Sequence, residues 1–387
     1  MKLKLVATCL FGLERLLGEE IEALGYDRLE TADGRVTFAG DEQAVALANV
    51  FLRYAERVYI LLGDFRAETF DELFEGTRAL PWEQFIGKND AFPVKGHSVA
   101  SKLFSIPDCQ KIIKKATVTR LSSVYGLTRF PEEGTTYQIV FFILRDRAQL
   151  MIDTSGSPLH KRGFRPEAGD APIRETLAAA MVALTRPRED VVIYDPFCGS
   201  GTIAIEAAMM AKNIAPGKNR RFAAENFAAI PHSLFDLARE EALDGERESE
   251  AEILASDIDP SMVALTIENA RRAGVSSNLR AFTADARRIE VPRDKKGSII
   301  TNPPYGERLM TPEEVEKLYR DFGTACRHLP PWHIYVITSH PEFARVFGRR
   351  ADKIRKLYNG MIPCFFYQFF RTAEEQKEFG KRGYRKK

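Results

Sequence analysis

Apolar residues recur along this chain in two different patterns, and the pattern changes near residue 173. Before that point, alternating stretches such as Leu3–Ala7 stand beside apolar residues at helical spacing, as in Leu13–Leu24. Alternation predicts strands with one buried face, and recurrence every three to four residues predicts amphipathic helices. After that point, continuous apolar runs alternate with helical segments, which is typical of a parallel sheet covered by helices.

The first 155 residues divide into two α+β units. In the first unit, Asp33-Gly34 predicts a tight hairpin. A further strand is expected at Ala55–Leu61. The second unit is expected to contain a short helix at Pro81–Phe85, a strand at Pro93–Ala100, a helix at Asp108–Leu121 and strands at Tyr137–Arg145 and Ala148–Asp153. We expect domains at residues 1–64 and 65–155, a Gly- and Pro-rich linker at 156–172, and a third domain at 173–387.

The third domain carries the alternating pattern of strands and helices. Its expected strands are Val191–Tyr194, Glu252–Ser256, Leu279–Thr283, Ser298–Thr301, His333–Thr338, Lys353–Leu357 and Ile362–Phe369. The last two flank Asn359-Gly360, which is a hairpin signal. The expected fold class is therefore α/β: a Rossmann-like, seven-stranded, mostly parallel sheet, as in class I methyltransferases, preceded by α+β regions. Residues 213–245 form a long insertion whose role the sequence leaves open.

Composition excludes several classes of protein. Of the 387 residues, 44% are hydrophobic and 28% are charged, as in soluble globular proteins of more than one domain. No apolar run is long enough to span a bilayer, and charged residues interrupt the N-terminal segment where a signal peptide would be apolar. A cytoplasmic location without a membrane partner is expected. The five cysteines are scattered, so neither a metal site nor a disulfide framework is expected.

Basic side chains cluster locally, although the formal net charge is only +2. The cluster comprises Lys95, Lys102, Lys111, Lys114, Lys115 and Arg120. Lys161 and Arg162 are further candidates, in the segment that leads into the third domain. Such residues are typical of a surface that binds the phosphates of RNA. A solvated helix face would account for the cluster equally well.

A Gly-rich turn follows the first strand of the third domain, in Asp195-Pro196-Phe197-Cys198-Gly199-Ser200-Gly201-Thr202. Glycines let a ligand approach the backbone, and Thr202 begins a helix whose N-terminus would face that ligand. Asp195 would repel a phosphate but suits an ammonium or sulfonium group. Asp257 and Asp285 end the next two strands, where they could accept hydrogen bonds from a ribose and an adenine amino group.

These features favour S-adenosylmethionine as the cofactor. The expected contacts are Asp195, Pro196, Phe197, Gly199, Gly201, Thr202, Asp257, Ile258, Asp285, Ala286 and Asn302. A dinucleotide would prefer an acid about twenty residues after the turn, and the next strand-end acid lies much further along. Plain loop caps are the remaining alternative for the three aspartates.

Asn302-Pro303-Pro304-Tyr305 follows the fourth strand. The amino group on a base is a poor nucleophile because its lone pair is delocalised into the ring. The Asn302 side chain and the Pro303 carbonyl can accept its protons, the two prolines stiffen the backbone, and Tyr305 can stack on the base. We therefore predict Asn302, Pro303, Pro304 and Tyr305 as catalytic residues for methylation of an exocyclic amine. A plain turn is the alternative.

Both motifs resemble those of class I RNA methyltransferases that carry a THUMP domain. Leu159–Arg165 and Ala171–Ala180 are similar to the segment that leads into the catalytic domain of that family, and Ser105–Ala116 resembles its THUMP helix. The resemblance is strongest with the bacterial group related to 23S rRNA guanine-N2 methyltransferases. It implies a ferredoxin-like region and a THUMP module for RNA before the methyltransferase domain. It also implies that Arg165 and Pro172 lie where the connecting segment closes over the cofactor.

The expected activity is S-adenosylmethionine-dependent methylation of guanine N2 in 23S rRNA. Guanine N2 of tRNA and adenine N6 are alternatives, because the same acceptors fit either amine. A non-catalytic RNA-binding or ribosome-assembly factor is the alternative of another class. The expected partner is RNA, 23S rRNA or tRNA, and the sequence leaves monomer and homodimer equally open.

Overall fold

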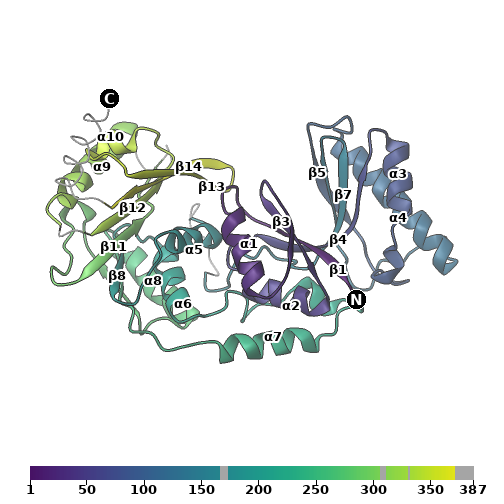
Figure 1. The fold of residues 1–387 in the computed structure, drawn as a ribbon, viewed down its shortest axis with the longest axis horizontal. Coiled ribbons are helices and arrows are strands. Elements are labelled where there is room, and N and C mark those ends of the chain that lie inside the picture. The colour runs from purple at the N-terminus through teal and green to yellow at the C-terminus, as the bar shows by residue number, and fades with distance from the viewer. Residues whose placement is uncertain (166–172, 306–310, 330–331, 371–387) are drawn as a thin grey trace. The chain divides into compact units, whose positions relative to one another are not determined.

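The computed structural model describes residues 1–165, 173–305, 311–329 and 332–370 (Figure 1). Within it the chain forms two compact units. The first unit comprises Met1–Cys9, Glu14–Leu159 and Pro216–Asp244. The second comprises Leu10–Leu13, His160–Ala215 and Gly245–Lys387. Each unit is built around its own seven-stranded sheet.

The first unit contains a single sheet in which the strands follow the order β2-β3-β1-β4-β7-β6-β5. Its elements are β1 (Leu3–Thr8), α1 (Glu14–Ala23), β2 (Arg28–Ala32), β3 (Arg35–Gly40), α2 (Glu42–Phe51), β4 (Arg57–Arg66), α3 (Phe70–Arg78), β5 (Val94–Val99), α4 (Ile106–Tyr125), β6 (Ile139–Leu144) and β7 (Arg147–Asp153). Strand β4 pairs with β1 on one side and β7 on the other, and Ile60 has a partner in each. The two α+β regions expected from the sequence therefore share one continuous sheet.

Helix α4 is longer than the sequence indicated. Proline in its first turn supplies a preset backbone, and Gly126 ends the helix in the left-handed conformation at φ 68°. The expected helix at Pro81–Phe85 is a short 3₁₀ turn, Trp82–Gln84. Helix α3 begins with a capping box, in which Thr69 and Glu72 bond each other's backbone N–H groups.

The insertion belongs to the first unit, not to the domain in which the sequence placed it. Residues Pro216–Asp244 include a 3₁₀ turn at Ala223–Asn226 and α7 (Ser233–Asp244), which packs on α2. Phe227 stacks on Tyr137 with ring centroids 4.3 Å apart. The Gly217 N–H donates to the Val50 carbonyl at 2.9 Å, and a Cβ on Gly217 would lie 2.6 Å from the Asn49 carbonyl oxygen. The continuous domain expected at 173–387 is thus interrupted.

The second unit has the expected sheet, in the order β10-β9-β8-β11-β12-β14-β13. Its elements are α5 (Glu175–Leu184), β8 (Val191–Asp195), α6 (Thr202–Ala211), β9 (Ile253–Asp257), α8 (Pro260–Ala273), β10 (Leu279–Thr283), β11 (Lys296–Thr301), α9 (Pro312–Cys326), β12 (His333–Thr338), α10 (Phe343–Phe347), β13 (Lys353–Asn359) and β14 (Ile362–Phe369). The strands from β10 to β12 are parallel, and the closing hairpin is antiparallel. The chain runs from β8 outward to β10 and then returns to β11, so a topological switch point lies between β8 and β11.

No described helix combines the length and apolarity needed to cross a bilayer. Likewise, within the described ranges no group of three or more His, Cys, Asp or Glu side chains is placed to hold a metal ion.

Candidate active site

The two loops singled out from the sequence are neighbours in the second unit. Strands β8 and β11 are paired in parallel, with Ile299 opposite Tyr194 (Figure 1). At their carboxyl ends, the Thr301 hydroxyl donates a hydrogen bond to the Asp195 carboxylate at 2.6 Å. The Gly-rich turn at residues 195–202 and the loop at residues 302–305, here called the Asn302 corner, are therefore joined at the switch point, where α/β sheets bind their ligands.

Asp195 lies at the base of this edge. Its exposed fraction is 1%, and burial raises the pKa of its carboxyl to about 7. Hydrogen bonds from the Thr301 hydroxyl and the Phe197 N–H favour the charged form, whereas nearby Asp257 disfavours it. A cation close to this carboxyl would strengthen its ionised form.

The two glycines of the turn have different functions. Gly199 has φ 51°, and nothing lies within 4 Å of the position its Cβ would take, so its backbone faces open space. Gly201 has φ 85°, and a Cβ there would lie 2.7 Å from Cγ2 of Thr266. Gly199 therefore fits a close approach by a ligand, and Gly201 is required for packing against α8. Thr202 is buried at the first position of α6.

Two residues of α8 hold the turn in place, and the sequence reading missed both. The Thr266 hydroxyl donates to the Gly199 carbonyl at 2.8 Å, and the Asn269 amide donates to the Ser200 carbonyl at 2.9 Å. Both side chains are buried, one helical turn apart. In the sequence, these two residues could have been recognised as polar residues on the otherwise apolar, buried face of a helix.

The acids at the ends of the neighbouring strands already accept hydrogen bonds. Asp257 accepts from the N–H groups of Gly199 and Asp259, each at 3.0 Å, so it fixes the turn and each carboxylate oxygen keeps a second lone pair. Asp285 is held by the Arg287 guanidinium at 2.7 Å, and this pairing keeps the Asp285 pKa below its ordinary value. Of the apolar neighbours expected at the cofactor, Ile258 is exposed and Ala286 is buried.

The Asn302 corner contains an unused acceptor. Oδ1 of Asn302 is buried and has no hydrogen-bond partner among the residues that the structure describes. The backbone beside it is fixed, because the Tyr319 hydroxyl of α9 donates to the Pro304 carbonyl at 2.8 Å. Tyr319 is itself fully buried and was missed from the sequence, where it stands in the apolar stripe of its helix.

The Tyr305 hydroxyl points to the closing hairpin, where it accepts a hydrogen bond from the Asn359 amide at 3.1 Å. Burial raises the Tyr305 pKa. This bond fixes one end of the ring beside the Asn302 corner. Stacking of the ring on a base stays a prediction. Pro303, the other expected acceptor, is buried beside Asn302.

The segment before α5 corrects one prediction. The Arg162 side chain is 1% exposed and is paired with Glu206 at 3.1 Å, so it cannot lie on an RNA-binding surface. The prediction that Arg162 binds RNA is wrong for this structure. Lys161 is exposed. The Arg165 side chain is 8% exposed and is paired with Glu175 at 2.6 Å. Pro172, also expected near the cofactor, lies outside the described residues.

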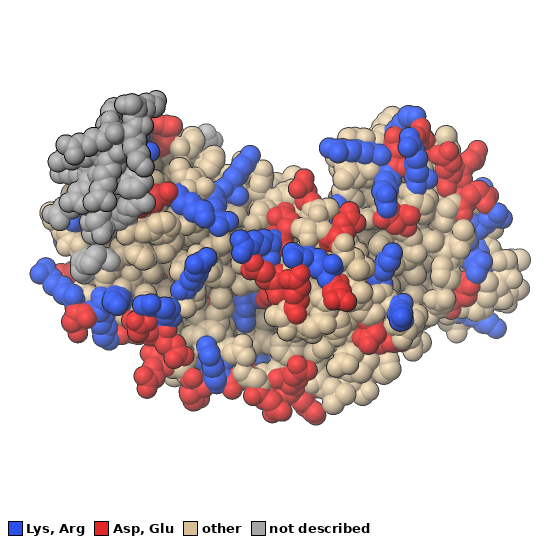
Figure 2. All heavy atoms as spheres, viewed as in Figure 1, with Lys and Arg blue, Asp and Glu red and all other residues tan. Residues whose placement is uncertain are grey.

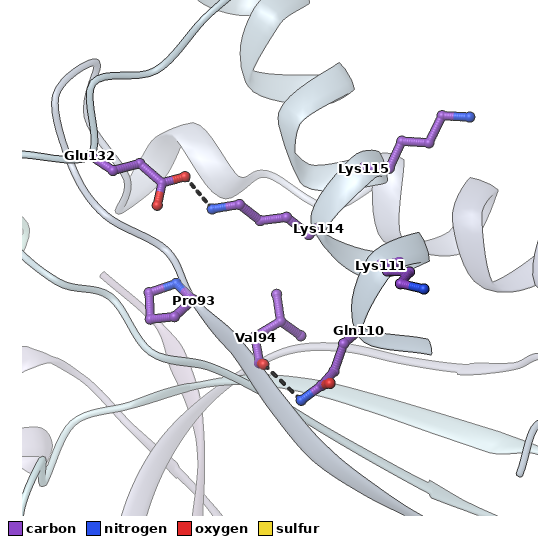
Figure 3. A pocket seen from close by; sticks show the side chains of 7 residues that line it. All are labelled: Pro93, Val94, Gln110, Lys111, Lys114, Lys115 and Glu132. Atoms are coloured by element: carbon purple, nitrogen blue, oxygen red, sulfur yellow. Dashed lines mark hydrogen bonds and ion pairs between the residues drawn. The ribbon is translucent and has the colours of Figure 1, made fainter. Parts of the chain in front are cut away.

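The basic residues of the first unit are of two kinds. Lys111, Lys114 and Lys115 line an open groove of about 570 Å³ between α4 and β5 (Figure 3). Lys114 reaches across this groove to Glu132 and lies 3.5 Å from the centroid of the Phe92 ring. Elsewhere Lys102 pairs with Glu68 and Arg120 pairs with Glu83, while Lys95 is exposed. Figure 2 shows basic and acidic side chains interspersed over this unit.

Comparison with known families agrees with this arrangement. Residues 162–368 match the methyltransferase domain described as RMKL-like, residues 4–59 match the RlmL ferredoxin-like domain, and residues 67–153 match the THUMP domain. The chain belongs to the RMKL-like methyltransferases. This RMKL-like chain is accordingly an S-adenosylmethionine-dependent methyltransferase with an N-terminal ferredoxin-like region, a THUMP domain and a Rossmann-like catalytic domain.

Several relatives match over nearly the whole chain. YpsC of Bacillus subtilis (strain 168), whose name proposes an RNA methyltransferase, is 42% identical and covers 97% of this chain and 98% of its own. The ribosomal RNA large subunit methyltransferase K/L of Syntrophotalea carbinolica is 32% identical over 98% of this chain, which spans 55% of that relative's length. The crystal structure of SMU.472 in complex with SAH has a TM-score of 0.89 and 39% identity, covering 96% of this chain and 99% of that one.

Proposed function

We propose that this RMKL-like methyltransferase methylates an exocyclic amino group of a base in RNA, and that the base is guanine, at N2, in 23S rRNA. The THUMP domain and the names of the two relatives, an RNA and a ribosomal RNA methyltransferase, support an RNA substrate. The name of the K/L relative supports ribosomal RNA of the large subunit. The amine as the acceptor rests on the Asn302 corner.

The buried, unpartnered Oδ1 of Asn302 is the observation that carries this proposal. An unsatisfied buried oxygen costs about 1–3 kcal/mol, so it persists where a ligand completes it. Its immediate backbone is fixed by Tyr319, and the neighbouring strand end carries Asp195, joined through Thr301. An acceptor held in this way suits an N–H donor that arrives with the substrate.

The residues of the turn fit S-adenosylmethionine. The open space at Gly199 admits a ligand to the backbone, and the absence of basic residues from Asp195 to Thr202 disfavours a phosphate. Asp257 keeps lone pairs for ribose hydroxyls, and SMU.472, a relative of 39% identity, was crystallised with SAH. When bound, S-adenosylmethionine supplies an electrophilic methyl group and leaves as S-adenosylhomocysteine.

The chain's own residues orient the amine and accept its protons. Oδ1 of Asn302 accepts one N–H of the amino group, which draws the nitrogen lone pair out of the plane of the base. The Pro303 carbonyl is the second acceptor in this proposal. Tyr305, held through Asn359, provides a face on which the base stacks. A strong base is not required, because the amino proton becomes acidic once the nitrogen is alkylated and then passes to water.

The groove and the exposed lysines of the first unit are proposed to hold the phosphates of the RNA. Lys95, Lys111 and Lys115 are the candidates, because they are exposed and their ammonium groups can reach solvent, with Lys111 also 3.7 Å from the Asp108 carboxylate. Lys102, Lys114 and Arg120 are paired with carboxylates, so each would have to exchange its partner to bind a phosphate. Guanine N2 of tRNA and adenine N6 remain the competing substrates.

The proposal is tested by mass spectrometry of nucleosides from 23S rRNA and tRNA of a strain that lacks the gene. Loss of N2-methylguanosine from 23S rRNA is expected. In vitro, with that rRNA as acceptor, Asn302→Ala should lower kcat by at least about 100-fold, because one preorganised acceptor is lost. Binding of S-adenosylhomocysteine, followed by calorimetry, should stay within about twofold.

Asn302→Asp is the matched control, because it keeps an acceptor oxygen at this position and the size of the side chain, and it should retain far more activity than the alanine variant. Full activity of Asn302→Ala would disprove the proposed role of the side-chain oxygen. An unchanged nucleoside profile in rRNA, with a loss in tRNA or of N6-methyladenosine, would replace the proposed substrate.

A further inference from the structure

Two buried Arg–Glu pairs link the segment before α5 to the helices beside the Gly-rich turn. Arg162 pairs with Glu206 at 3.1 Å, with side chains 1% and 0% exposed. Arg165 pairs with Glu175 at 2.6 Å, with side chains 8% and 5% exposed. A buried ion pair is stable only when its remaining donors and acceptors are also satisfied. The contacts of the Arg165–Glu175 pair leave one carboxylate oxygen without a hydrogen-bond donor among the described residues.

The Arg165 pair reaches the cofactor turn. Nη1 of Arg165 donates to the Ser200 hydroxyl at 3.4 Å, and Ser200 lies between the two glycines of the turn. Both Nε and Nη2 of Arg165 contact the same carboxylate oxygen, Oε1 of Glu175. Oε2 of Glu175 is buried without a hydrogen-bond partner in the described part of the chain. One oxygen of a buried carboxylate is thus open, and Arg165 connects this pair to Ser200 of the turn, whose backbone faces open space at Gly199.

The chemistry of the pair selects a ligand class. The open oxygen of Glu175 requires a hydrogen-bond donor and prefers a positive one, and the guanidinium of Arg165 prefers a carboxylate. A free α-amino acid group carries both, an ammonium and a carboxylate on one carbon. At Asp195, the other buried acid of the edge, the Thr301 hydroxyl and the Phe197 N–H both donate to the same oxygen, Oδ1.

We infer that the Arg165–Glu175 pair recognises the amino-acid end of the methyl donor, with Oε2 of Glu175 accepting a hydrogen bond from its α-ammonium group. This inference rests on S-adenosylmethionine being the cofactor. Arg165 acts on the same end, as the positive partner that orients Glu175 and neutralises the donor's carboxylate. Glu175 is then a binding residue for the cofactor, outside the Gly-rich turn and the strand-end acids.

The test compares two ligands by calorimetry. S-adenosylhomocysteine carries the amino-acid end, and 5′-methylthioadenosine shares its adenosine and thioether but lacks that end. Glu175→Gln keeps the shape of the side chain and converts the open acceptor to a donor. It should weaken S-adenosylhomocysteine by about 10- to 100-fold and leave 5′-methylthioadenosine within about twofold. Glu206→Gln, which alters the other buried pair, is the matched control and should not separate the two ligands.

Equal weakening of both ligands by Glu175→Gln would overturn the inference and leave Glu175 a support of the turn. No weakening of either would also overturn it. A wild-type protein that bound neither ligand would instead defeat the proposed cofactor. If Glu175→Gln does not fold, the test uses the wild-type protein. An analogue of S-adenosylhomocysteine without the α-amino group should then bind at least about 10-fold more weakly than S-adenosylhomocysteine itself. Equal affinity for the analogue would contradict the inference.

Discussion

At the scale of single residues, two buried oxygens at the carboxyl edge of the second sheet differ in their hydrogen bonding. The Asp195 carboxylate receives hydrogen bonds from Thr301 and Phe197, whereas Oδ1 of Asn302 is left open among the described residues. The first arrangement fixes the geometry of the edge, and the second leaves a place for a donor. A buried carboxylate is costly to ionise even with two donors, which makes Asp195 sensitive to pH.

The stability of the protein should depend on pH through Asp195. Burial raises the pKa of its carboxyl from 3.8 to about 7. Between these values the native state binds the proton and the unfolded chain releases it, so the stability associated with this proton is greatest at low pH and is lost as pH rises through about 7. Asp195→Asn removes this dependence. The thermal midpoint of Asp195→Asn minus that of the wild-type protein should therefore increase as the pH is raised from 5 to 8.

Circular dichroism over a series of pH values measures this difference. Asp190→Asn is the control, since Asp190 is an exposed carboxylate just before the same strand and its variant should follow the wild-type curve. A constant difference between Asp195→Asn and the wild-type protein across that range would show that Asp195 does not titrate near neutrality.

At the scale of elements, helices α8 and α9 position the two functional loops. Thr266 and Asn269 of α8 hold the carbonyls of the Gly-rich turn, and Tyr319 of α9 holds the carbonyl of Pro304. Each loop is thus fixed by hydrogen bonds from side chains of one helix, α8 for the Gly-rich turn and α9 for the Asn302 corner. These bonds keep the backbone in one conformation without using the groups proposed to meet the ligands.

The two glycines of the turn should respond differently to alanine. Gly201→Ala places a Cβ 2.7 Å from Thr266 at φ 85°, so it should lower the free energy of unfolding by about 1–3 kcal/mol. Gly199→Ala meets open space and should cost only about 1 kcal/mol from its left-handed backbone. Urea denaturation measures both.

Affinity for S-adenosylhomocysteine should show the reverse order, with the larger loss in Gly199→Ala, because the new methyl group enters the space proposed for the ligand. Comparable stabilities of the two variants would contradict the packing role of Gly201.

The elements also show what a sequence can predict. The strands of the second sheet and the acids at their ends were predictable, because continuous apolar runs ended by Asp or Asn define buried strands. Thr266 and Tyr319 were not assigned a role from the sequence. Their role depends on which loop each helix lies beside in the folded protein, and the sequence does not show this. Arg162 was misplaced for the same reason: its segment reads as basic, but its partner Glu206 comes 44 positions later.

At the scale of the whole molecule, each unit is assembled from separate pieces of chain. The first sheet runs through both α+β regions, because β4 pairs with a strand of each. The sequence suggested two separate units here, whereas the structure has one continuous sheet. Residues Pro216–Asp244 complete that unit from within the methyltransferase region. No periodicity in the insertion could reveal this, because its partners, Tyr137 and α2, lie far away in sequence.

Residues 1–159 should therefore be incomplete by themselves. A fragment of residues 1–159 exposes Tyr137 and the face of α2 that α7 covers. Joining residues 216–244 to that fragment through a Gly/Ser linker should raise its free energy of unfolding by about 3 kcal/mol or more, as expected for restoring a buried Phe. Urea denaturation of the two fragments measures the gain.

The same joined fragment with Phe227→Ala is the control, and it should lose most of the gain. Equal stability with and without the added segment would mean that the insertion contributes nothing to the first unit.

The interrupted connectivity limits how this protein can be recombined. A hybrid made by one crossover at residue 160 would take its methyltransferase region from a relative, and with it a foreign copy of 216–244 to pack against the native Tyr137 and α2. Productive exchange of catalytic regions among homologues thus requires matched junctions near 159, 215 and 244.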